Sequence, residues 1–154
     1  MAIPKTALIR ELVKGDFEDV LILYKELTGG LPVLDGDAGR EMFAEILNKT
    51  NMAIIGAEVE GNIVSVATLH THHNLTFGGR PYCLIENVVT LKSHQKRGLA
   101  RQVMNALIEV AWKANACRVV LLTGKSLGAS GFYEKFGFSK EEKFGMLLLP
   151  PSGA

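Results

Sequence analysis

The chain has 154 residues, of which 47% are hydrophobic, and its formal net charge at pH 7 is +1. This length and composition predict one globular domain over residues 1–154, with a core large enough to fold unaided. Lys and Arg are scattered among Asp and Glu and form no basic stripe of the kind that nucleic-acid binding requires. Nucleic acid is therefore not expected as a partner.

The amino terminus and the two cysteines indicate the compartment. Residues 1–5 lack a hydrophobic signal core, and no apolar run approaches the ~20 residues of a membrane span. Cys83 and Cys117 lie in apolar, strand-like segments without CxxC spacing, which favours buried thiols over a zinc site or a disulfide framework. We therefore expect a cytoplasmic protein that does not enter a membrane.

The first half of the chain predicts a strand, two helices and a hairpin. Apolar residues recur at helical spacing after Asp16 and again after Asp37, so each aspartate is expected to cap a helix. Gly and Asn tolerate positive φ, which predicts a tight turn at residues 60–62. The expected elements are a strand at 7–13, helices from 16 to about 28 and from 37 to about 48, and strands at 52–58 and 63–70.

The second half predicts a loop, a strand and the clearest helix of the chain. That helix carries one apolar stripe from Leu99 to Ala114 and closes at Asn115. Ser126 is expected to cap a short further helix, and Gly137 stands where a left-handed residue is needed. The remaining expected elements are a loop at 73–81, a strand at 82–90, a short buried strand at 118–123 and one or two strands within 138–149.

The segment between the strand at 82–90 and the helix at 99–114 is a glycine-bearing loop, Gln95 to Ala100. The first amide N–H groups of a helix have no partner within the helix, and small residues in the turn before it leave them accessible to an anion. The alternative is a plain strand-to-helix turn in which Gly98 serves only backbone geometry. Lys96, Arg97 and Arg101 add positive charge there, although charged residues near a helix start are often merely solvated.

The spacing Gln-x-x-Gly-x-Ala resembles the (Arg/Gln)-x-x-Gly-x-(Gly/Ala) signature of the GNAT family of N-acetyltransferases, whose loop amides hold the pyrophosphate of acetyl-coenzyme A (acetyl-CoA). The segment 132–138, Phe-Tyr-Glu-Lys-Phe-Gly-Phe, also resembles a family motif, and the likeness covers roughly residues 63–138. It implies an α/β (α+β) GNAT fold, with a mixed, mostly antiparallel sheet that splays at the acetyl-CoA site and about four flanking helices.

The resemblance also implies which residues bind acetyl-CoA. Val88 and Val89 would offer backbone groups to the pantetheine arm. Ser126 stands where the family often has an Asn near the coenzyme, but it is shorter and alternatively serves only as a helix cap. The implied pyrophosphate-binding residues are Gln95, Lys96, Arg97, Gly98, Leu99, Ala100 and Arg101.

Two residues are candidates for acid–base chemistry. Glu86 lies in an otherwise apolar strand, where a buried carboxylate is costly unless it is paired or functional, and it could act through water as the general base that deprotonates an amine. The alternative is a Glu that orients substrate. Tyr133, by resemblance, protonates the leaving thiolate of coenzyme A; its alternative role is core packing.

Three histidines, His70, His72 and His73, cluster at the end of one strand, and His70 and His72 should share a face. No carboxylate or thiol accompanies them at ligand spacing, so a pocket rim or a solvent-facing position is expected and a metal is not.

These features predict direct acetyl transfer from acetyl-CoA to a primary amine of a small molecule or peptide, without an acyl-enzyme. Residues 67–69 and 85–89 are similar to glucosamine-6-phosphate N-acetyltransferases, with Asn87 where those enzymes have Asp. This suggests an amino sugar phosphate as acceptor, bound by loops at 27–37 and 73–81. The competing class is a non-catalytic acyl-CoA-binding or partner-binding domain. Resemblance also implies a homodimer, with residues 146–149 as a contact strand.

Overall fold

The structure, a computed structural model, describes residues 6–151. Residues 1–5, in which no signal core is predicted, lie outside this range. The described chain divides between Val119 and Val120 into two units, which are considered separately. Within the described range no helix is both long and apolar enough to cross a bilayer.

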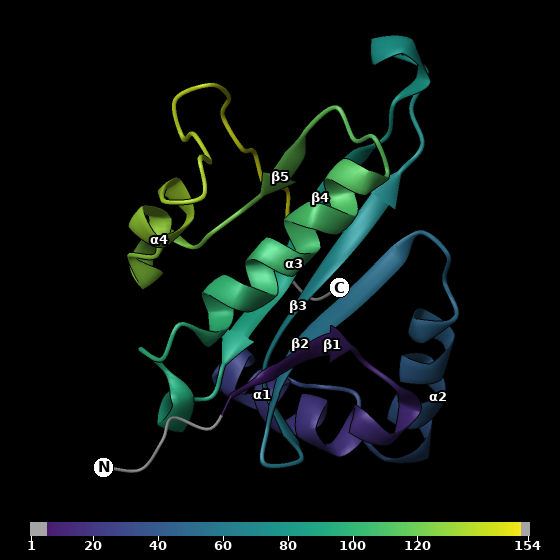
Figure 1. Cartoon of the computed structure of the whole chain (residues 1–154), viewed down its shortest axis with the longest axis vertical. Helices are drawn as coiled ribbons and strands as arrows, with labels where there is room; N and C mark the ends of the chain where they lie inside the picture. Colours follow the sequence, from purple (N-terminus) through teal and green to yellow (C-terminus); the bar gives the residue numbers. More distant parts are fainter. Residues whose placement is uncertain (1–5, 152–154) are drawn as a thin grey trace. The chain divides into compact units, whose positions relative to one another are not determined.

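An open sheet forms the centre of the first unit (Figure 1). The strand order is β1-β2-β3-β4-β5, and β1 to β4 pair antiparallel, each with the next. The α/β class with an open, mostly antiparallel sheet is therefore confirmed. The strands are β1 (Leu8–Glu11), β2 (Met52–Val59), β3 (Asn62–His72), β4 (Tyr82–Thr90) and β5 (Val119–Leu121), which begins in the first unit.

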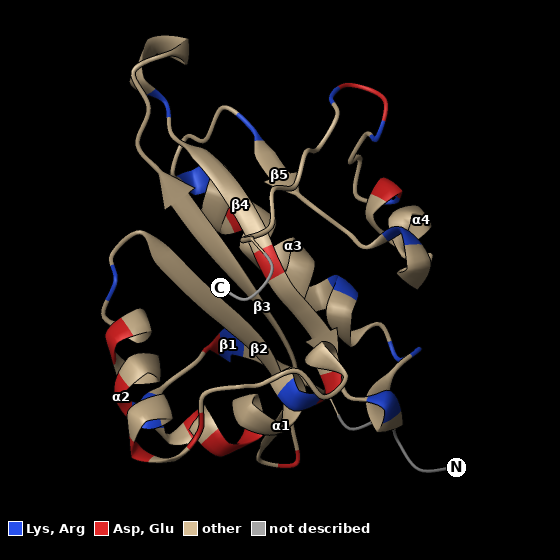
Figure 2. Cartoon of the chain, turned by 180° about the vertical axis from the view of Figure 1, so that it is seen from behind, with Lys and Arg blue, Asp and Glu red and all other residues tan. Residues whose placement is uncertain are grey.

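Three helices of the first unit, α1 (Phe17–Thr28), α2 (Gly36–Leu47) and α3 (Leu99–Lys113), cover the sheet. Helices α1 and α2 lie on one face and α3 on the other (Figures 1 and 2). Residues 63–69 of β3 are all buried, as expected for a central strand covered on both faces. Figure 2 also shows acidic residues gathered on α1 and α2.

Asp16 fixes the start of α1 through tertiary contacts. It occupies the position before the helix but makes no side-chain bond to the helix amides. Its carboxylate accepts two hydrogen bonds from the Arg10 guanidinium, at 2.8 and 2.9 Å, and one from the Val13 N–H at 2.8 Å. The Arg10 side chain holds the pKa of Asp16 below its usual value. Arg10 also donates to Glu58 at 2.7 Å, which ties β1 to β2.

Two predictions about the first unit were wrong in detail. The cap of α2 is Asp35, not Asp37, because the Gly39 N–H already bonds to the Asp35 carbonyl at 3.0 Å, earlier than a cap at Asp37 allows. Cys83 is fully buried as expected, whereas Cys117 is only half-buried. The predicted tight turn between β2 and β3 is present, with positive φ at Gly61 (85°) as expected, but the second positive φ is at Glu60 (54°) and not at Asn62, which begins β3.

In the second unit, the described residues beyond β5 contain a 3-10 turn at Lys125–Leu127 and helix α4 (Ser130–Glu134). Ser126 lies inside the 3-10 turn and Ala129 precedes α4, so the prediction that Ser126 caps this helix was wrong. The strand predicted at 118–123 is shorter and only half-buried. Gly137 has a φ of 96°, the positive value expected.

The predicted strands within 138–149 are also absent from the described chain. An apolar run becomes a strand only when a neighbouring strand accepts and donates its backbone hydrogen bonds, and none pairs with this segment. Its apolar side chains are instead exposed, including Phe144 (99%), Met146 (91%) and Leu148 (95%).

Candidate active site

A β-bulge interrupts the pairing of β3 with β4. Val66 faces Val89 and Thr68 faces Glu86, so Asn87 and Val88 together stand opposite Ala67. Asn87 has a φ of 53°, a left-handed value that Asn tolerates better than most residues. A bulge takes backbone groups out of the ladder and redirects side chains. The bulge therefore leaves one residue of the Asn87–Val88 pair without a partner in β3, directly after Glu86.

The Glu86 side chain is 54% exposed, so the expectation of a buried carboxylate was wrong. The bulge accounts for the difference, because it brings residues 86 and 87 to the surface of a strand whose other positions are mostly buried or half-buried. Glu86 Oε2 lies 3.9 Å from His70 Nε2 on the neighbouring strand. The carboxylate is thus accessible to an incoming amine and faces an imidazole.

Tyr24 of α1 reaches the bulge from the helix side; in the sequence it fits the helical spacing predicted after Asp16, which assigns it no role in a site. Burial raises the pKa of its hydroxyl, and hydrogen bonding to Thr68 and Asn87 opposes that rise. Thr68 Oγ1 is buried and forms no hydrogen bond of ordinary distance and angle within residues 6–151, so its contact with Tyr24 is long or bent. The sequence does contain a signal for this contact, because Tyr24 is a tyrosine in the apolar stripe of α1, where an aliphatic residue would be enough for packing.

The loop at Gln95–Gly98 lies between a 3-10 turn, Lys92–His94, and the start of α3. Lys96 (φ 62°) and Gly98 (φ 76°) are both left-handed. No side chain caps α3, so the amides of its first turn are left without side-chain partners. Gln95 Nε2 donates to the Thr90 carbonyl at 3.2 Å, which holds the loop against the end of β4.

The remaining loop residues differ in exposure. Lys96, Arg97 and Arg101 are exposed, and Arg97 also donates to the Ser93 carbonyl at 3.2 Å. Leu99 is only 6% exposed, so its side chain belongs to the core and its backbone alone is available to a ligand. Ala100 is half-buried. The loop thus combines free helix amides with three cations.

Tyr133 and Ser126 lie in the second unit. Burial raises the pKa of Tyr133, so its hydroxyl stays protonated at neutral pH and is able to donate a proton. Its ring contacts those of Phe132 and Phe138, at centroid distances of 5.1 and 6.3 Å. Ser126 is exposed.

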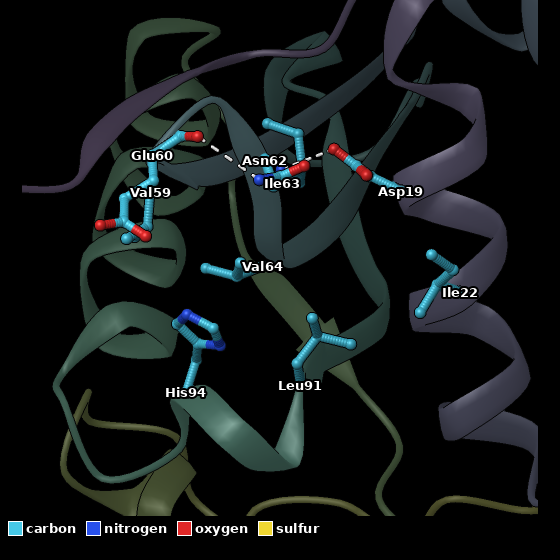
Figure 3. Close-up of a pocket in the computed structure, with 9 residues that line it drawn as sticks. All are labelled: Asp19, Ile22, Val59, Glu60, Asn62, Ile63, Val64, Leu91 and His94. Atoms are coloured by element: carbon cyan, nitrogen blue, oxygen red, sulfur yellow. Dashed lines mark hydrogen bonds between the residues drawn. The ribbon is translucent and has the colours of Figure 1, made fainter.

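A cleft of about 260 Å³ lies between α1, the β2–β3 turn and the end of β4 (Figure 3). Asp19 accepts the Ile63 N–H at 2.8 Å on its wall. None of the predicted site residues lines it. Among the described residues there is also no group of three or more His, Cys, Asp or Glu side chains able to hold a metal.

The geometry described so far comprises an open sheet, a bulge beside Glu86 and a loop with uncapped helix amides, and the class of protein follows from comparison with known families. Residues 20–138 match the acetyltransferase (GNAT) family, and the chain belongs to it. It is therefore an enzyme that transfers an acetyl group to an amine.

Three relatives illustrate the similarity. The glucosamine 6-phosphate N-acetyltransferase of Trypanosoma brucei brucei is 31% identical over 88% of this chain and 90% of its own. A protein from Agrobacterium tumefaciens str. C58, assigned as an acetyltransferase, is 36% identical, with a TM-score of 0.85 over 92% of this chain and 99% of its own. An aminoglycoside N-acetyltransferase solved with CoA is 22% identical and shares the fold, with a TM-score of 0.77 over 96% and 99% of the two chains.

Proposed function

We propose that the protein binds acetyl-CoA and transfers its acetyl group directly to a primary amine in a ternary complex. The observation that carries this proposal is the Gln95–Gly98 loop, where uncapped amides at the start of α3 lie beside three cations. Such an arrangement favours a pyrophosphate. The CoA complex of the structural relative supports the same ligand.

In this proposal Glu86 acts through water as the general base, and Tyr133 protonates the coenzyme A thiolate as it leaves. The amine nitrogen attacks the thioester carbonyl, the C–S bond breaks, and the proton lost by the nitrogen passes to the carboxylate. Direct transfer needs no nucleophilic side chain, and the full burial of Cys83 is consistent with that. Val88, Val89 and Ser126 complete the proposed coenzyme contacts.

The acceptor is proposed to be a small amine, with an amino sugar phosphate as the specific candidate. Its support is the named activity of the Trypanosoma relative. Asn87 is the point of difference, because it stands where that class of enzyme has Asp and so brings one negative charge less to the bulge.

A homodimer and a cytoplasmic location are further parts of the proposal. The exposed apolar side chains within 144–149 are a surface that a second copy could cover, although not as the strand first predicted. The two cysteines are free thiols, as is usual in a reducing compartment.

Calorimetry with acetyl-CoA tests the coenzyme site. A Cβ at Gly98 would meet no atom within 4 Å, so the substitution Gly98→Asp introduces charge and backbone strain but no collision. Gly98→Asn is the matched control, because it has nearly the same shape without the charge and Asn tolerates the left-handed region. We expect Gly98→Asp to lose about 100-fold or more in affinity and Gly98→Asn about tenfold or less. Wild-type affinity in a folded Gly98→Asp variant would exclude this loop as the site.

The alternative is a non-catalytic acyl-CoA-binding or partner-binding domain. As an acyl-CoA-binding domain it also predicts that Gly98→Asp loses affinity for acetyl-CoA. It differs in predicting no acetylation of any amine under conditions where acetyl-CoA binds.

A further inference from the structure

A row of stacked side chains crosses the sheet beside Glu86, and we call it the aromatic ladder: His70, His72, Tyr82, Arg118 and Phe77. The imidazoles of His70 and His72 are parallel within 2°, with centroids 6.1 Å apart. His72 lies 5.0 Å from the Tyr82 ring. The Arg118 guanidinium carbon is 4.8 Å from the Tyr82 centroid and 5.7 Å from that of Phe77. All five residues belong to the first unit.

The strand register places the ladder on the same face as the proposed base. Thr68 faces Glu86 and His72 faces Tyr82, and residues two apart in a strand point to the same side. His70 then approaches Glu86 at one end of the ladder, and Arg118 stacks on Tyr82 at the other. A ligand with its amine at Glu86 would therefore extend along the ladder toward Arg118.

Arg118 is held by its two rings but has no carboxylate partner. Within residues 6–151 it forms no ion pair, and one nitrogen donates weakly to Cys117 Sγ at 3.5 Å. Acidic residues gather instead on α1 and α2 (Figure 2). A planar guanidinium that is fixed between two rings and still has free N–H groups is suited to bind a carboxylate or phosphate through two parallel hydrogen bonds.

Phe77 brings the loop before β4 into contact with this arginine. Phe77 has a φ of 54°, a left-handed value that bulky residues rarely adopt, and its side chain is 65% exposed. It lies in the 73–81 segment from which sequence analysis expected part of the acceptor pocket. The exposed ring nevertheless stays against Arg118.

We propose that the aromatic ladder binds the acceptor and selects amines that carry a negatively charged group about 13 Å from the nitrogen. This inference rests on the proposed function, because it takes Glu86 as the place of the reacting amine. It favours a longer small-molecule or peptide amine over the amino sugar phosphate, whose amine and phosphate lie only about 7 Å apart by bond lengths. The distance of about 13 Å follows from the four residue steps that separate Tyr82 from Glu86 in β4, at about 3.3 Å a step in a strand. The charged group then meets Arg118, and the histidine and tyrosine rings contact the body of the acceptor.

Tetraglycine is a suitable probe, because four extended residues span about 13–14 Å between amine and carboxylate. Its carboxamide has the same amine and length without the charge, and diglycine has the charge but spans only about 7 Å. Affinities are measured by NMR titration, following the histidine imidazole and arginine Nε–H signals, with the protein both free and saturated with coenzyme A. This readout does not depend on acetyl transfer.

Tetraglycine should bind about 10–100-fold more tightly than its carboxamide or diglycine, the range expected for hydrogen bonds to a charged group. Arg118→Met keeps the stacking volume and should reduce the preference to about threefold or less. Arg40→Met is the matched control, because Arg40 also lies over a ring, that of Phe17 at 5.4 Å, but outside the ladder. It should leave the preference unchanged.

Equal affinity for tetraglycine and its carboxamide in the wild type would overturn the proposal, as would an undiminished preference in Arg118→Met. Circular dichroism verifies that the variant is folded; if it is not, Arg118→Lys, which keeps the charge without the planar fork, should lower the preference and serves as the second variant. A protein that acetylates no amine yet shows the preference would refute the proposed function and leave the ladder as an anion-binding site.

Discussion

The pair formed by Arg10 and Asp16 makes a quantitative test of how α1 is fixed. Asp16→Asn removes the charge but keeps the shape of a side chain that is 11% exposed and accepts three hydrogen bonds of 2.8–2.9 Å. Breaking a buried ion pair costs about 3–5 kcal/mol. Arg10 is 27% exposed and keeps its bond to Glu58, so the expected loss is smaller, about 2–3 kcal/mol.

The pH dependence of this loss has a defined sign. The pKa of Asp16 is lower in the folded protein than in the unfolded chain, where it is near ~4. The carboxylate therefore stabilises the fold above pH ~4, and that contribution disappears as the pH falls through the lowered folded-state pKa. The stability difference between wild type and Asp16→Asn should be constant from about pH 8 to 5 and shrink below about pH 4.

Urea denaturation at several pH values measures the difference, and the thermal midpoint should fall by roughly 5–10 °C at neutral pH. Asp37→Asn is the control, because the Asp37 side chain is fully exposed and its contact with Arg40 is 3.4 Å long. It should change stability by less than about 0.5 kcal/mol. A loss below about 1 kcal/mol in Asp16→Asn, or one that persists unchanged in acid, would refute the reasoning.

Three further predictions concern the proposed function. Glu86→Gln should lower turnover about 10²–10⁴-fold in a thiol-release assay with acetyl-CoA affinity unchanged, and a loss under about tenfold would make Glu86 a positioning residue. Tyr133→Phe should lower turnover about 10–10²-fold, because a thiolate of pKa near ~8.5 leaves without absolute need of an acid; wild-type rates at every pH would make Tyr133 a packing residue. Light scattering should return twice the chain mass, with Leu148→Glu giving the monomer, and a monomeric wild type at micromolar concentration would contradict the dimer.

The elements best predicted from sequence are those with local signals. The strand at 82–90 agrees with β4 at both ends, and the start of α3 is correct because the apolar stripe begins directly after Gly98. The position of the Gln95–Gly98 loop, the proposed coenzyme site, follows from these two bounds. Its exposed cations and left-handed positions are consistent with the motif read from sequence.

The features missed depend on pairing between distant residues. The bulge is a shift in the register between β3 and β4, and a register depends on both strands. The exposure of Glu86 therefore could not be predicted from the apolar pattern of one strand. The ladder likewise joins Arg118 to Tyr82 across 36 positions of the chain. The strands predicted within 138–149 were wrong because apolar composition alone does not supply a pairing partner.

Incubation of the purified protein with acetyl-CoA and a panel of primary amines tests the central claim most directly. The panel should include glucosamine 6-phosphate and amines with and without a distant anionic group, with free thiol followed in time and products identified by mass spectrometry. The account predicts thiol release that requires both protein and amine and that matches the N-acetylated product one for one. Acetyl-CoA binding without acetylation of any amine in the panel would contradict it.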